Sequence, residues 1–183
     1  MKKIEIKTTF KKLLADVYTP VGIYLRLRDR FRDTILLEST DFHAGENSYS
    51  FIGINAIAGI EISNTAFIEY KLPGHKAEKI KIEKPTGVPD HLWNFMNRFS
   101  IEPTEQKQVN IAQGLFGYTS YDAVQFFDSI SLSQSKSNDQ LSTTNAVPLM
   151  RYRLYQYIIV INHFKDELFI CENVIKGMES EIS

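Results

Sequence analysis

A chain of 183 residues, 43% hydrophobic and 23% charged, has the length and balance of one globular domain with a sizeable core. Its 21 Lys and Arg against 22 Asp and Glu give a net charge of −1, so no basic surplus points to nucleic acid. No apolar run is long enough to span a membrane, and residues 1–7 are too charged for a signal peptide. Cys171, the single cysteine, fits a reducing compartment, so we expect a cytoplasmic protein.

The first part of the chain predicts strands and one short helix. Residues 2–7 alternate polar and apolar side chains, which predicts a strand. Thr8 or Thr9 is a suitable N-cap for a helix over residues 10–16. Residues 21–28 alternate again and predict a half-buried strand.

The middle of the chain predicts strands joined by short turns, followed by a helix. The strands are expected over 34–39, 49–54, 56–62, 66–72 and, as a lysine-guarded edge strand, 76–84. Pro89 opens a helix over 91–100, in which Leu92, Phe95, Met96 and Phe99 recur at helical spacing.

The last part of the chain predicts further strands around a long polar segment. A strand over 111–117 and a short helix ending near 127 precede residues 129–146, whose serine-rich composition predicts a long mobile loop. Strands over 151–163 and 168–174 follow, and Gly177 is expected to begin another helix. Because strands outnumber helices and short turns join most of them, the sequence predicts an α+β fold of mostly antiparallel sheet with a few short helices.

The sequence offers little of the chemistry that marks an active site. The four histidines have no paired spacing with other ligand residues, so we expect no metal site. There is no Ser-His-Asp order and no nucleophile elbow, and the glycines of 114–117 lack the Lys-Ser/Thr of a phosphate loop. We therefore assign no catalytic residue to this chain.

Glu38 and Ser39 end a predicted strand and are the most informative polar residues. A carboxylate beside a hydroxyl at a strand end can hold a small zwitterion, with Glu38 taking the ammonium group. The alternative, from the residues alone, is that both side chains are simply solvated or tie strand ends together.

Three motifs follow one another along the chain. The first is Leu36-Leu37-Glu38-Ser39 followed by the segment 48–53, Ser-Tyr-Ser-Phe-Ile-Gly. The second is the segment 114–118 followed by Tyr-Asp-Ala-Val at 121–124, and the third is 147–150 with Asn-His-Phe at 162–164. In this order they resemble the N-terminal part of anthranilate synthase component I and its sibling, aminodeoxychorismate synthase component I. The fold implied is the N-terminal part of that family's sandwich.

The resemblance implies that residues 1–183 are an N-terminal regulatory domain, a fragment of a larger lyase. In the family, a C-terminal catalytic domain that binds magnesium converts chorismate and ammonia to anthranilate and pyruvate. None of that domain's motifs occurs here, so we expect the fragment alone to be inactive and to hold no cofactor.

The same resemblance implies a site for L-tryptophan, the feedback inhibitor of the family. The matching positions are Leu37, Glu38 and Ser39, with Ser50 as a weaker candidate. Ser48 stands where the family commonly has a basic residue, a difference that bears on ligand affinity or loop geometry. In the family the catalytic region completes this pocket.

The implied partners are the chain's own catalytic domain and a glutamine amidotransferase subunit, component II. Two alternatives to an anthranilate synthase fragment stay open. One is the N-terminal domain of aminodeoxychorismate synthase component I, in the folate pathway, and the other is a free-standing amino-acid-binding module.

Overall fold

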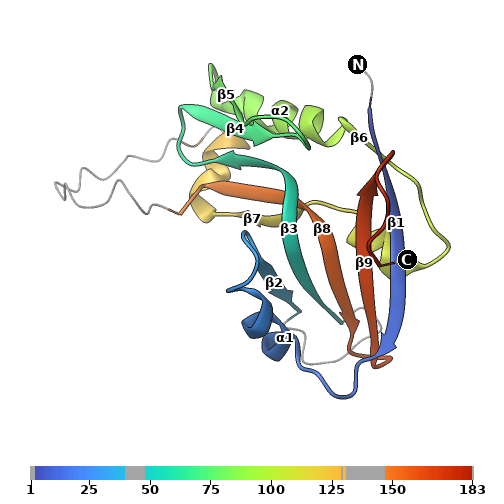
Figure 1. Ribbon diagram of the computed structural model, residues 1–183. Coiled ribbons are helices and arrows are strands. Elements are labelled where there is room, and N and C mark those ends of the chain that lie inside the picture. Colours follow the sequence, from blue (N-terminus) through green and yellow to red (C-terminus); the bar gives the residue numbers. More distant parts are fainter. Residues whose placement is uncertain (1–2, 40–47, 129, 131–146, 183) are drawn as a thin grey trace. The chain divides into compact units, whose positions relative to one another are not determined.

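The computed structural model describes residues 3–39, 48–128, 130 and 147–182 (Figure 1). Most of the loop predicted over 129–146 lies outside these residues. The described strands are β1 (Ile4–Leu14), β2 (Ile35–Glu38), β3 (Tyr49–Ile62), β4 (Phe67–Lys71), β5 (Glu78–Lys81), β6 (Phe99–Ile101), β7 (Phe116–Thr119), β8 (Met150–Asn162) and β9 (Glu167–Ile175). The helices are α1 (Pro20–Leu27), α2 (Val88–Met96) and α3 (Lys107–Ala112), with the 3₁₀ turns η1 (Pro85–Gly87) and η2 (Tyr121–Phe126).

The strand pairing confirms an α+β fold with a mostly antiparallel, mixed sheet. β2 pairs antiparallel with β3, β8 with β9, and β9 with β1, while β6 is parallel to β1. The long pairing of β1 with β9, from Ile6 opposite Ile175 to Leu14 opposite Glu167, is visible at the right of Figure 1. None of the helices in the described ranges is long and apolar enough to cross a membrane.

The chain divides into two compact units. The first comprises Met1–Ile57, Arg98–Phe116 and Leu154–Ser183, and the second comprises Ala58–Asn97 and Gly117–Arg153. β3 and β8 are neighbours in the sheet, and each contributes residues to both units.

One face of the sheet in the first unit packs against α1. Ile52, Ile54, Ile159, Ile161 and Leu168 form a buried cluster on this face. From α1, Ile23, Tyr24 and Leu27 pack on it, a helical rather than a strand-like spacing. The helix begins at Pro20 because the Thr19 hydroxyl accepts a hydrogen bond from the Gly22 N–H at 3.1 Å, a side-chain N-cap.

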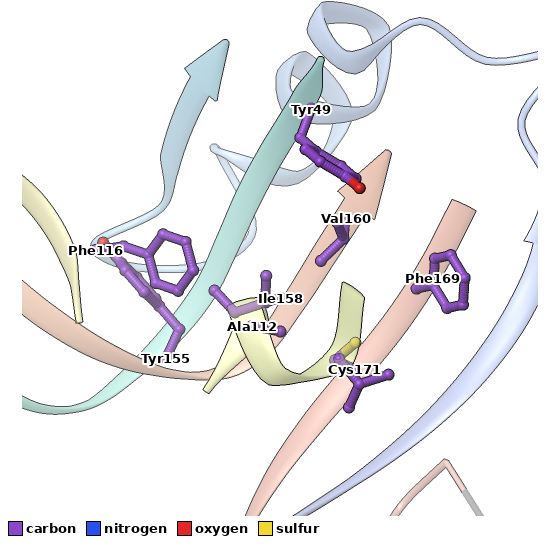
Figure 2. Close-up of a cluster of buried hydrophobic side chains, with 9 residues drawn as sticks. Tyr49, Ala112, Phe116, Tyr155, Ile158, Val160, Phe169 and Cys171 are labelled. Carbon is purple, nitrogen blue, oxygen red and sulfur yellow. The ribbon is translucent and has the colours of Figure 1, made fainter. Parts of the chain in front are cut away.

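The opposite face of the same unit carries the larger core cluster, which α3 covers (Figure 2). Its strand residues and its helix residues point toward one another in this view. The buried members are Tyr49, Val109, Ala112, Phe116, Tyr155, Ile158, Val160, Phe169 and Cys171. Burial of Val109 and Ala112, both 0% exposed, fixes the side of α3 that meets the sheet.

The second unit contains the β3–β4 hairpin, α2, η2 and most of β7. Gly59 lies opposite Lys71 in the hairpin, and β5 adds to the free edge of β4. Glu61 receives hydrogen bonds from Arg151 at 2.9 Å and Arg153 at 2.7 Å. Burial alone would raise the pKa of Glu61, but these hydrogen bonds and the nearby positive charge outweigh it and lower that pKa.

Several predicted elements are confirmed, and others are wrong. The strands around 34–39, 49–54, 151–163 and 168–174 exist, as does the hairpin, although 49–54 and 56–62 form one strand, β3. The helix predicted over 91–100 runs over Val88–Met96, and Phe99 lies in β6 rather than on its stripe.

The errors have different physical causes, which include long-range strand pairing and local capping. The helix predicted over 10–16 is a continuation of β1, since residues 10–14 pair with β9, and the strand predicted over 21–28 is α1. The strand predicted over 111–117 begins only at Phe116, after α3, which the sequence did not predict. No helix follows Gly177 within the described residues to 182; the chain turns there with φ at 96°.

Gly117 is required where β7 passes β8. A Cβ at this position would lie 1.8 Å from the Arg151 carbonyl oxygen, which is backbone and cannot move aside. We expect Gly117→Ala to lower the free energy of unfolding by about 3 kcal/mol or more. Gly87→Ala is the control, since nothing lies within 4 Å of its Cβ, and it should change stability by less than about 0.5 kcal/mol. Equal urea midpoints for the two variants would contradict the close approach.

Glu172 of β9 holds the segment that follows this strand. Its carboxylate is 1% exposed, and one oxygen accepts hydrogen bonds from the Ser180 hydroxyl at 2.7 Å and from two backbone N–H groups, of Glu181 at 2.9 Å and Ile182 at 3.3 Å. Burial alone would raise the pKa of Glu172, but these bonds and one from Gln156 hold that pKa below its ordinary value of 4.5.

The stabilisation by Glu172 should therefore depend on pH. Because the folded pKa is depressed, the contribution is fully present above pH 4.5 and is lost as the pH falls through the lower folded value. We expect Glu172→Gln to lower stability at neutral pH by about 2 kcal/mol and to flatten the acid limb of a plot of unfolding free energy against pH. Glu179→Gln, which removes an exposed carboxylate of the same segment, is the control. An unchanged acid limb in Glu172→Gln would refute this role.

Candidate functional site

The four residues predicted to bind a ligand lie on one antiparallel strand pair. In the register of β2 on β3, Leu37 is opposite Phe51 and Glu38 is opposite Ser50. The Ser39 N–H extends the pairing with a hydrogen bond to the Tyr49 carbonyl at 3.2 Å. Because side chains alternate along a strand, Leu37 and Phe51 share one face, whereas Glu38 and Ser50 share the other, and Ser39 returns to the face of Leu37.

Three of the four predicted residues line one pocket of about 340 Å³ in the first unit. This volume is at the lower end of the range of roughly 300–1,000 Å³ that is usual for small-molecule sites. The lining residues are Leu37, Glu38, Ser39, Tyr49, Phe51, Ile111 and Phe116.

Aromatic rings make up much of the apolar part of the pocket. The Phe51 and Phe116 ring centroids are 5.5 Å apart, and those of Tyr49 and Phe51 are 6.1 Å apart, both in tilted arrangements. Tyr49 and Phe116 are each 8% exposed, so the core holds them in place. These rings and Leu37 offer an aromatic ligand an apolar surface with fixed geometry.

Glu38 and Ser39, which are both exposed, are the polar residues of the lining. Ser39 shares the face of Leu37, whereas the side chain of Glu38, the last residue of β2, starts from the opposite face. The Glu38 carboxylate can accept hydrogen bonds from an ammonium group, and the Ser39 hydroxyl can donate to or accept from a second polar group. The combination of an apolar wall and a carboxylate suits a molecule with an aromatic ring and a positively charged amine.

Ser50 lies opposite Glu38 in the strand pair but does not line the pocket. Its side chain is 1% exposed, and its hydroxyl lies 2.7 Å from Nε2 of His163. The His163 backbone N–H donates to the Ser48 carbonyl at 3.1 Å, so the end of β8 is tied to the start of β3. Ser48 itself, the position that differs from the family pattern, is 8% exposed.

Four lining residues were not predicted as site residues: Tyr49, Phe51, Ile111 and Phe116. Tyr49, Phe51 and Phe116 lie inside motifs that resemble the family, so a signal existed, although their role was not apparent. Ile111 was predicted in a strand, but it belongs to α3. Its place in the lining results from tertiary packing, for which the sequence holds no local signal.

The described residues provide no reactive group at this pocket. Cys171 is 0% exposed, and burial raises the pKa of its thiol to about 12, so it is not a nucleophile. Nor do three His, Cys, Asp or Glu side chains gather anywhere in the described ranges as a metal site requires. The arrangement can bind a ligand, and we assign no chemical step to it.

A larger cavity of about 670 Å³ lies elsewhere in the first unit, by β1, β6 and the segment after β9. Its charged groups include Lys176 and Glu5, which form an ion pair at 2.5 Å. None of the predicted residues lines it, and its lining is not aromatic. The smaller pocket is the better candidate because its lining combines aromatic rings with a carboxylate and a hydroxyl.

Comparison with known proteins places this chain beside anthranilate synthase component 1. The protein of that name from Lactococcus lactis is 24% identical over 174 residues, which cover 93% of this chain and 33% of that protein. The protein from Methanothermobacter thermautotrophicus is 30% identical over 135 residues, which cover 74% of this chain and 26% of that protein. A crystal structure of anthranilate synthase component I from Streptococcus pneumoniae gives a TM-score of 0.49 at 18% identity, over 94% of this chain and 33% of the other.

No family model matches the chain. The matched residues span about a third or less of the length of these curated relatives. The two sequence relatives confirm what the three motifs indicated: over most of its length, this chain is similar to part of anthranilate synthase component I.

Proposed function

We propose that this chain is the tryptophan-binding regulatory portion of anthranilate synthase component I. The observation that supports this most directly is that Leu37, Glu38 and Ser39 line one pocket with three aromatic rings. They are the residues that the sequence motif assigns to the effector. The register of β2 on β3 sets Leu37 opposite Phe51, one of the aromatic side chains that an indole would contact.

The proposed binding mode follows from the chemistry of the pocket. The indole packs between the aromatic rings and Leu37, where removal of its surface from water is favourable. The ammonium group of L-tryptophan pairs with the Glu38 carboxylate, whose long side chain turns round the end of β2 to reach it, and the Ser39 hydroxyl bonds to a polar group of the amino acid. We propose no direct contact by Ser50 in this mode; it supports the strand pair through His163.

We propose that the parent protein is a cytoplasmic lyase that converts chorismate and ammonia to anthranilate and pyruvate, with component II as its amidotransferase partner. Magnesium is assigned to the catalytic domain of that parent on the resemblance to the family alone. The chain alone is expected to lack activity. Tryptophan would act by favouring one arrangement of the two domains, with a coupling of roughly 1–3 kcal/mol.

The names of the two relatives favour this proposal over its alternatives. Both curated relatives are called anthranilate synthase component 1, rather than aminodeoxychorismate synthase. Both are also much longer than the region they share with this chain, which favours a part of an enzyme over a free-standing module.

Titration of L-tryptophan into the chain, followed by calorimetry, tests the site. We expect saturable binding that Glu38→Gln weakens about 10-fold, because a neutral amide loses the charge-assisted bond to the ammonium group. Ser39→Leu should weaken binding at least as much, since it replaces a polar partner by a bulkier apolar side chain.

Glu83→Gln is the matched control, since it removes an exposed carboxylate that does not line the pocket. Its affinity for tryptophan should equal that of the unaltered chain. Binding that Glu38→Gln and Ser39→Leu leave unchanged would place the ligand elsewhere, and absence of saturable binding would refute tryptophan binding by this chain.

A further inference from the structure

The short helix α3 forms one wall of the pocket, through Ile111. A helix of this length, six residues, is not stable by itself in water, and no side chain caps its N-terminus. Its position therefore depends on contacts with the rest of the first unit, which include a set of buried polar side chains.

The C-terminal end of α3 is held by Asn173 of β9, a residue outside the pocket. Its side chain is 1% exposed, and Nδ2 donates to the Ala112 carbonyl at 3.2 Å and the Tyr155 carbonyl at 2.9 Å. One amide group thus joins the last residue of the helix to β8.

The amide orientation of Asn173 is fixed by a second contact. Its Oδ1 accepts a hydrogen bond from the Thr8 hydroxyl at 2.7 Å, and the Thr8 oxygen in turn accepts one from Gln113 at 3.1 Å. Gln113 is the residue directly after α3, and its amide also donates to the Glu102 carbonyl at 2.9 Å. Thr8, Gln113 and Asn173 are all buried, so water cannot replace these bonds.

The segment that precedes α3 is tied to the helix separately, by Asn110. Its Oδ1 accepts from the Thr104 N–H at 2.8 Å, and its Nδ2 donates to the Thr104 carbonyl at 2.8 Å. Thr104 is exposed to a greater extent than Asn173, so these bonds compete with water. The buried contacts at the other end are the more costly to remove.

We infer that Asn173 is a positioning residue for the ligand pocket: it holds α3 against the sheet and thereby keeps Ile111 at the distance from Leu37 that a ligand ring requires. The inference rests on the proposed ligand site. Loss of the Asn173 donor would leave the carbonyls of Ala112 and Tyr155 buried without this partner, so the end of α3 would move or open to water.

Hydrogen exchange and ligand titration on the full chain test this role together. The variant is Asn173→Leu, which has a similar shape but no hydrogen-bonding group. Thr8→Val is a milder second variant that removes the hydroxyl bonded to Asn173. The control is Ile161→Ala, which removes packing on the face of the sheet that α1 covers.

In Asn173→Leu, we expect the amides of α3 to exchange at least 10-fold faster, relative to those of α1, and L-tryptophan to bind about 10-fold more weakly. Thr8→Val should change both in the same direction by less. Ile161→Ala should accelerate exchange in α1 rather than α3 and leave the affinity unchanged.

Exchange in α3 that rises no more than in α1, in both Asn173→Leu and Thr8→Val, would overturn the inference. So would faster exchange in α3 with an unaltered affinity for tryptophan, because the helix would then not control the pocket. If neither the chain nor the complete protein that carries it takes up tryptophan, the proposed function fails, while selective loosening of α3 in the two variants still supports the positioning role.

Discussion

The register of β2 on β3 is the constraint on which the site depends. Leu37 opposite Phe51 puts an aliphatic side chain beside an aromatic ring on the face that α3 covers, with Ser39 next along the same face. A slip of one residue would exchange the two faces of β2 and turn Leu36 toward the pocket. Leu36 instead packs on the opposite cluster, beside α1, so both cores of the first unit oppose that slip.

Apolar packing and buried hydrogen bonds have different roles around this pocket. The aromatic rings of Tyr49 and Phe116 belong to the apolar core. Burial of apolar surface supplies most of the stability, but it is non-directional and does little to fix the orientation of a packed element. The amide of Asn173 has a directional requirement that only one placement of α3 meets. The polar contacts of Asn173 thus fix the position of α3, the wall of the pocket that carries Ile111, although they lie outside the pocket.

The sequence predicted the fold class and the long strands correctly, because β8 and β9 contain continuous apolar runs that are typical of buried strands. It failed for residues 10–14, which pair with β9 over a separation of more than 150 residues, and for 21–28, where the cap at Thr19 outweighs the alternation. The motif identified Leu37, Glu38 and Ser39 as a group, and all three line one pocket. Ile111 could not be predicted from the sequence, because its role depends on where α3 packs.

The regulatory role of the pocket is tested most directly with the complete protein that carries this chain, by following anthranilate fluorescence from chorismate, magnesium and ammonia with and without L-tryptophan. We expect anthranilate formation that tryptophan suppresses and that Ser39→Leu releases from suppression without loss of basal rate. Anthranilate formation that tryptophan does not affect would contradict the regulatory role of the pocket. Absence of anthranilate would contradict the parent activity and favour the aminodeoxychorismate sibling or a binding module.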